Sequence, residues 1–312
     1  MVRDRFVVIS ALLVLSAVGA ELLAAYNDTT GRPAELLFNL VFFAMLYGCP
    51  ALLIREFARR TGRGWPAILL LSAAAGLLQA GVIDQSLFSD SYGDVEGWEE
   101  SLRATYIEPL GVGAYMLQNF VLGHIIYSFC APIALAEAMR PALAHRPWLR
   151  RRGIVIATAC WLLVAGLILA DGDGTGATLG EVAATLTVIG ALAFAALHVG
   201  GRGERTPRVR TVLIVSFALA TAHACMPETW AGVAGAVLVV VASVALLLRG
   251  EWGVAHIAAM GTGVLLSRGA LAFLYYPVVG ETSAARKYSH NVVMLLLVAA
   301  AGAYALRRAR RT

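Results

Sequence analysis

The chain has 312 residues, of which 59% are hydrophobic and 14% are charged, and its formal net charge is +5. Soluble globular domains carry roughly 25% charged residues, so this composition excludes an ordinary soluble domain and indicates a membrane protein. The basic residues are scattered over many short segments and form no stripe with interleaved aromatic side chains, so we expect membrane lipids, and no nucleic acid, as partners.

Ten apolar runs follow one another along the chain, and several reach the length of about 18 to 20 residues that a helix needs to cross a bilayer. Backbone groups inside a bilayer must bond to one another, so continuous Leu, Ala and Val runs predict helices. The expected spans are residues 6–25, 34–56, 66–88, 111–137, 153–170, 178–199, 211–226, 230–248, 253–276 and 289–306. We therefore expect an all-α fold, a polytopic helical membrane bundle that forms one domain over residues 1–312.

The distribution of basic residues predicts the orientation of this bundle, because Lys and Arg gather in cytoplasmic loops. With the N-terminus inside, 20 of the 25 basic residues fall in segments that face the cytoplasm, and four fall in outer segments. The remaining one, Arg268, lies within a span. The alternation predicts that both termini are cytoplasmic and that the protein belongs to a bacterial plasma membrane.

The first span has an alternative interpretation as a cleaved signal peptide. Arg3 and Arg5 precede an apolar stretch that ends in small residues at Gly19 and Ala20, which is an acceptable cleavage pattern. Its apolar stretch is longer than a usual signal core, which favours a retained span.

The longest outer loop, residues 89–110, is predicted to contain a short amphipathic helix. Val95, Trp98, Leu102 and Tyr106 recur at spacings of three and four residues, which gives an apolar stripe along one helical face. Such a helix lies on the outer membrane surface as an anchor, or over the mouth of the bundle as a lid.

Polar and ionisable groups inside the spans are the strongest functional candidates, because each costs roughly 2.5 to 3.5 kcal/mol to insert if it is charged and central. Those in the outer half of the membrane predict one outward-facing polar cavity, and His124 lies deeper. The candidate cluster is Glu21, Gln79, Asp84, Gln118, Asn119, His124 and Arg268.

Arg268 must find an acceptor because a guanidinium cannot deprotonate, and we expect Asp84 or Glu21 to be its partner. One interpretation is a substrate cavity; the other is that the pair only pins two helices together. Likewise, His124 either packs as a satisfied histidine or takes part in proton transfer. Glu137 is expected to extend toward Arg140 at the inner surface.

Established catalytic and metal-binding motifs are missing from the sequence. There is no phosphate-binding GxxxxGK loop, no HExxH and no GxSxG turn. The four cysteines lie in or at the ends of apolar runs without CxxC spacing, which predicts free thiols. We expect no cofactor and no metal, and an activity that is not enzymatic.

The segments YGCPALLIREFARRTGRGWPAILLL from Tyr47, GLLQAGVIDQSLF from Gly76 and HIIYSFCAPIALAEAM from His124 resemble a family of uncharacterised multi-pass membrane proteins of actinobacteria. The resemblance covers about the first 140 residues. It implies a multi-pass helical fold and brings no activity with it.

A second resemblance is to the CAAX-processing and bacteriocin-processing intramembrane proteases, on Phe120 and His124 as an FxxxH element and on His290 followed by Asn. Gln79 stands where those proteases have a glutamate that activates water, and an amide cannot accept that proton. The resemblance implies a hydrolase built around His124 or its inactive relative.

Three functions follow from these patterns. The first is a membrane protein that binds or transports a small or lipidic ligand through the outward-facing cavity. The second is the intramembrane hydrolase or its inactive relative, which requires an acidic group bonded to His124. The third is a scaffold without a ligand, in which the polar residues pair and leave no cavity.

Overall fold

The computed structural model describes residues 2–27, 29–93, 95–171, 176–199 and 207–311. The α-helices are α1 (Val2–Ala17), α2 (Pro33–Phe43), α3 (Cys49–Arg60), α4 (Trp65–Leu78), α5 (Trp98–Arg103), α6 (Ala114–Gly123), α7 (Ala131–Met139), α8 (Arg151–Asp171), α9 (Leu179–His198), α10 (Val209–Ala224), α11 (Trp230–Arg249), α12 (Val254–Leu271) and α13 (Ala284–Ala309). Four π-helical segments interrupt them: η1 (Val18–Leu22), η2 (Ala44–Gly48), η3 (Gln79–Ile83) and η5 (His124–Cys130). The 3₁₀ turns are η4 (Glu108–Leu110), η6 (Pro141–Leu143) and η7 (Ala272–Leu274), and the strands are β1 (Tyr106–Ile107) and β2 (Val112–Gly113).

The expected polytopic helical bundle is confirmed. Within the described residues, nine helical runs are long and apolar enough to cross a membrane. The expected span at residues 211–226, the seventh in chain order, corresponds to α10, which has 16 residues. At 1.5 Å per residue α10 is about 24 Å long, shorter than a hydrocarbon core about 30 Å thick. That the whole chain forms one domain stays a prediction.

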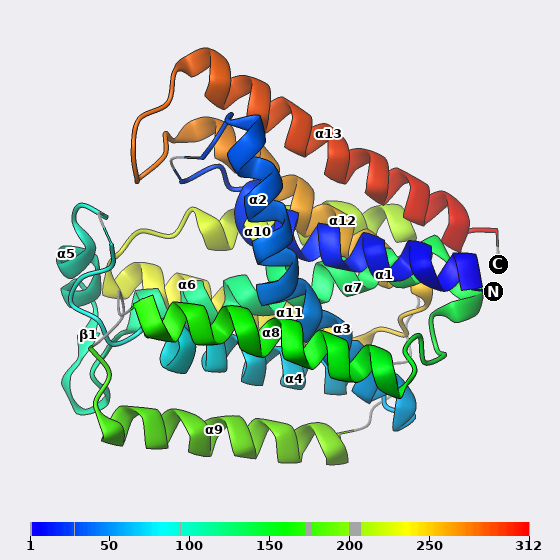
Figure 1. Ribbon diagram of the computed structural model, residues 1–312, viewed down its shortest axis with the longest axis horizontal. Helices are drawn as coiled ribbons and strands as arrows, with labels where there is room; N and C mark the ends of the chain where they lie inside the picture. The colour runs from blue at the N-terminus through cyan, green and yellow to red at the C-terminus, as the bar shows by residue number, and fades with distance from the viewer. Residues whose placement is uncertain (1, 28, 94, 172–175, 200–206, 312) are drawn as a thin grey trace.

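The two chain termini lie at the same end of the bundle, and α5 lies at the opposite end (Figure 1). A chain that crosses the membrane an even number of times has both of its termini on the same side. We refer to these as the terminal end and the α5 end of the molecule.

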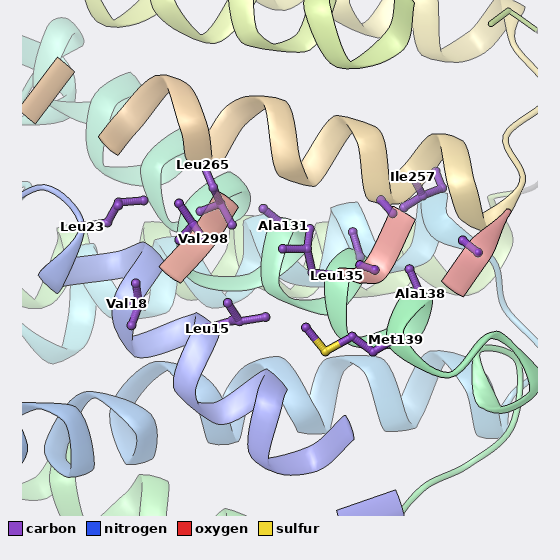
Figure 2. Close-up of a cluster of buried hydrophobic side chains, with 14 of the residues drawn as sticks. Leu15, Val18, Leu23, Ala131, Leu135, Ala138, Met139, Ile257, Leu265 and Val298 are labelled. Atoms are coloured by element: carbon purple, nitrogen blue, oxygen red, sulfur yellow. The ribbon is translucent and has the colours of Figure 1, made fainter. Parts of the chain in front are cut away.

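The main apolar core lies where α1, α7, α12 and α13 meet (Figure 2). Val18, Leu135, Leu265 and Val298 are at most 1% exposed there. Because lipid is as apolar as these side chains, close packing rather than escape from water stabilises helix contacts inside a bilayer.

Several helices at the periphery expose large apolar side chains along their length. Leu163 on α8, Phe194 on α9 and Leu238 on α11 are 59%, 65% and 69% exposed. A soluble protein rarely tolerates apolar surface on this scale, whereas lipid solvates it. These faces are therefore the lipid-facing surface.

The loop at the α5 end differs from its prediction. The helix covers only Trp98–Arg103, and Tyr106 lies in β1, which pairs antiparallel with β2. After β1, Pro109 and the left-handed Gly111 (φ 68°) turn the chain back into β2. The expected stripe is thereby split: Leu102 is buried, and the Trp98 ring stacks on Phe120 of α6.

Small residues let α10 approach α12 closely. A Cβ atom added to Gly263 would lie 2.5 Å from the Leu213 carbonyl oxygen and 3.0 Å from the Phe217 nitrogen. Both contacts are with backbone atoms, so α10 itself would have to move to make room.

Replacing Gly263 with leucine should therefore destabilise the protein by about 1 to 3 kcal/mol, the usual cost of overpacking. The matched control is Gly166→Leu on α8, where an added Cβ meets nothing within 4 Å. The measurement is the thermal unfolding midpoint of the full chain in one detergent. A Gly263→Leu variant as stable as Gly166→Leu would show that α10 and α12 are not packed this closely.

Candidate functional site

Each of the first four spans contains one π-helical segment, and these segments surround a single region of the bundle. A π-helical turn is a rare distortion that often occurs at functional sites, because it rotates the following side chains away from the regular helical direction. Glu21 lies in η1, Tyr47 in η2 and Gln79 in η3, and all three line the same cavity.

The cavity has a volume of about 310 Å³, at the lower limit of the roughly 300 to 1,000 Å³ typical of small-molecule pockets. Its walls come from η1, α2 and η2, η3, α8 and the connecting segments at the α5 end. The described lining residues are Glu21, Tyr26, Asn27, Phe42, Phe43, Leu46, Tyr47, Gln79, Asp84, Tyr92, Gly93, Ile168 and Asp171. Three of these carry carboxylates, five are aromatic, and none is basic.

Glu21 is the buried carboxylate on one wall, at 7% exposure. It accepts hydrogen bonds from the phenols of Tyr26 and Tyr47, the latter at 2.8 Å. Burial, followed by the charge of the neighbouring Glu21, raises the pKa of Tyr26 well above its ordinary value. Tyr26 therefore keeps its proton and serves as a neutral donor to Glu21.

Asp84 is the second carboxylate, at the end of η3. Its oxygens accept from the Gln79 amide at 3.1 Å and from the Ser86 backbone N–H at 3.0 Å. The sequence-predicted residues Glu21, Gln79 and Asp84 are thus brought together at one cavity. Within the described residues, the hydrogen bonds to the two carboxylates come from neutral donors.

Arg268 does not form the expected ion pair. Its guanidinium donates to the Ala20 carbonyl at 2.9 Å and lies over the Tyr127 ring, 4.4 Å from the ring centre. No ion pair with Asp84 or Glu21 forms within the described residues, and Arg268 does not line the cavity. The expectation fails because the wide turn of η1 presents a backbone carbonyl, which sequence cannot reveal.

Two more side chains reinforce this contact. His290 of α13 bonds the Leu22 carbonyl at 2.7 Å, and the Tyr275 hydroxyl donates to the Ala24 carbonyl at 2.6 Å. A helix end leaves carbonyls without partners, and in a membrane they need partners from other segments. Arg268 and His290 therefore fix η1, and with it Glu21, against α12 and α13.

His124 lies behind the cavity wall. Its Nδ1 atom is 3.2 Å from the Ser128 hydroxyl, and its ring stacks on Tyr47 with 5.4 Å between centres. No carboxylate bonds to His124 in the described part of the chain, so the geometry required by the hydrolase hypothesis is missing. The contacts match the packing interpretation.

Gln118 and Asn119 also lie away from the cavity, on α6. Of the seven predicted site residues, the cavity therefore contains three.

Sequence reasoning missed the aromatic part of the site. Phe42, Phe43 and Tyr47 form a continuous wall, with ring centres 5.5 Å and 6.0 Å apart. These residues sit inside an apolar run, where aromatic side chains carry no distinguishing signal. Tyr47 alone offered such a signal in the sequence, because a phenol within a span needs a hydrogen-bond partner.

A second polar cluster, near the terminal end, was also missed. Glu137 accepts from Arg55 at 3.0 Å and from Arg59 at 2.8 and 2.7 Å. The prediction that Glu137 extends toward Arg140 is wrong, because Arg140 bonds Asp4 at 2.9 Å. Helices α3 and α7 are close enough for a direct ion pair.

The other contacts of this cluster hold the segment that follows α7 in place. Arg55, fully buried, donates to the carbonyls of Leu143, Ala144 and Arg146 and lies 3.6 Å over the centre of the Trp148 ring. Glu56 accepts from the Trp148 backbone N–H at 2.8 Å. Every charge here has partners, which identifies a structural network rather than a binding site.

Replacing Glu137 with glutamine should destabilise the protein by about 3 to 5 kcal/mol, because two buried arginines lose their counter-charge. The control is Glu35→Gln, whose partner Arg32 is 3.4 Å away at an exposed site, where an ion pair contributes about 0 to 1 kcal/mol. Unfolding midpoints in one detergent compare the two. Equal midpoints would show that the buried pair does not stabilise the fold.

No group of three or more His, Cys, Asp or Glu side chains suited to a metal ion occurs in the described segments. The four cysteines are free thiols in this structure.

These features define a polytopic helical membrane protein with an acidic and aromatic cavity at one end. Residues 11–306 match the model of an uncharacterized membrane protein family, and the chain belongs to that family. The resemblance to such a family is confirmed, whereas the likeness to intramembrane proteases is not shown. No curated protein and no solved structure matches the chain.

Proposed function

We propose that this protein binds a small or lipidic ligand in the cavity at the α5 end. The observation that carries the proposal is the meeting of three π-helical segments, from three different spans, at one cavity that contains carboxylates. Distorted helices and buried carboxylates both cost stability, so their coincidence favours a binding role over simple packing.

The charge distribution supports a bacterial plasma-membrane protein with this cavity outside. The predicted inner segments hold most of the arginines, and the lining residues Tyr92, Gly93 and Asp171 belong to the opposite, predicted outer, end. Membrane lipids then surround the bundle, and the ligand enters from the outer side or the outer leaflet.

The two alternative functions have less support. A scaffold would pair its intramembrane charges, as Arg55 and Glu137 do, yet Glu21 and Asp84 face a cavity with only neutral donors. A hydrolase needs an acid beside His124, whose polar partner is Ser128. The cavity therefore remains the best functional candidate.

The proposal requires a hydrated cavity, which cysteine reactivity can test. Ile168, a half-buried lining residue on α8, is changed to cysteine with the four native cysteines replaced by alanine. Thiolates rather than thiols react with methanethiosulfonates, so reaction requires water. In nanodiscs, which expose both ends, this cysteine should react with a cationic or an anionic reagent.

Two reference proteins set the upper and lower limits for the rate at which Ile168→Cys reacts. Val278→Cys, 55% exposed in the segment between α12 and α13, sets the fast limit, and a protein retaining only the buried Cys49 sets the slow limit. A rate near that of Val278→Cys supports the proposal. A rate as slow as Cys49 with both reagents means a sealed, dry cavity and overturns it in favour of the scaffold.

A further inference from the structure

We infer that the cavity is selective for an organic cation bearing an ammonium group. This inference rests on the proposed function and specifies its ligand class.

The cavity carries excess negative charge. Glu21 and Asp84 are close enough to act on each other electrostatically, and Asp171 adds a third carboxylate at the end of α8. Two carboxylates in a medium of low dielectric repel strongly unless a cation lies near them. The hydrogen bonds to both groups come from phenols, an amide and a backbone N–H, none of which brings positive charge.

Arg268 supplies part of the counter-charge. Its field reaches Tyr26 on the cavity wall, although its guanidinium is engaged with Ala20 and Tyr127 behind η1. One arginine stands near three carboxylates, so the cavity keeps an excess of acidic groups. A cationic ligand would offset this excess, whereas an anion would add to the repulsion.

The aromatic walls select the kind of cation. Phe42, Phe43 and Tyr47 line one side, and Tyr92 lines another with its ring stacked on Trp98, 4.8 Å between centres. The faces of aromatic rings attract organic ammonium groups, which are weakly hydrated, and recognition of quaternary ammonium commonly uses such walls. A small metal ion would instead require more oxygen ligands than Glu21 and Asp84 supply.

The first test compares the rates of two reagents at Ile168→Cys, one carrying trimethylammonium and the other sulfonate. Relative to Val278→Cys, the cationic reagent should be favoured by about tenfold or more, because the carboxylates raise the local concentration of cations. Asp84→Asn and Glu21→Gln should each reduce this preference severalfold. Asp90→Asn is the matched control, since Asp90 bonds Arg103 at the same end without lining the cavity.

The second test measures protection of Ile168→Cys by choline and by 3,3-dimethylbutanol, its uncharged analogue of the same shape. Choline should slow the reaction, the neutral analogue should not, and Asp84→Asn should remove the difference. Equal protection by the two, no protection by choline, or no preference for the cationic reagent would overturn the cation inference. A readily modified cysteine in those cases leaves the proposed binding site standing, whereas a cysteine inert to both reagents defeats both proposals.

Discussion

The position of the candidate site depends on how the carbonyls at the end of the first span find donors in a medium without water. Arg268, His290 and Tyr275, all from the last two spans, donate to Ala20, Leu22 and Ala24. These bonds tie the first span to the last two and hold η1 in its widened turn. Glu21 lies inside that turn, so its place at the cavity follows from contacts made far away in sequence.

The charged side chains inside the bundle have different kinds of partner at the two ends of the molecule. Near the terminal end, Glu137 is shared by Arg55 and Arg59, and the remaining guanidinium protons reach backbone carbonyls. At the α5 end, the hydrogen-bond donors to Glu21 and Asp84 in the described part of the chain are neutral. A fully paired network rigidifies a fold, whereas carboxylates that form no ion pair on the wall of a cavity leave interaction energy available to a ligand.

Part of the site was predictable because a polar residue within an apolar run is costly to insert into a membrane, and such residues can be recognised in the sequence. Glu21, Gln79 and Asp84 were found in this way, and all three line the cavity. The same criterion selected Gln118, Asn119 and His124, which do not line the cavity, because insertion cost says nothing about the direction of a side chain. The partner of Arg268 was mispredicted because a backbone carbonyl exposed by a π-helical turn leaves no mark in the residue pattern.

The sequence by itself determined the class of the protein, since apolar runs about as long as a bilayer is thick can only be helices that cross it. It also marked which polar residues the membrane has to accommodate. Only the tertiary structure decided that three π-helical turns face one cavity, that Phe42, Phe43 and Tyr47 build its wall, and that Glu137 belongs to Arg55 and Arg59. Those outcomes depend on helix rotation and on contacts between distant segments, and hydropathy along the chain encodes neither.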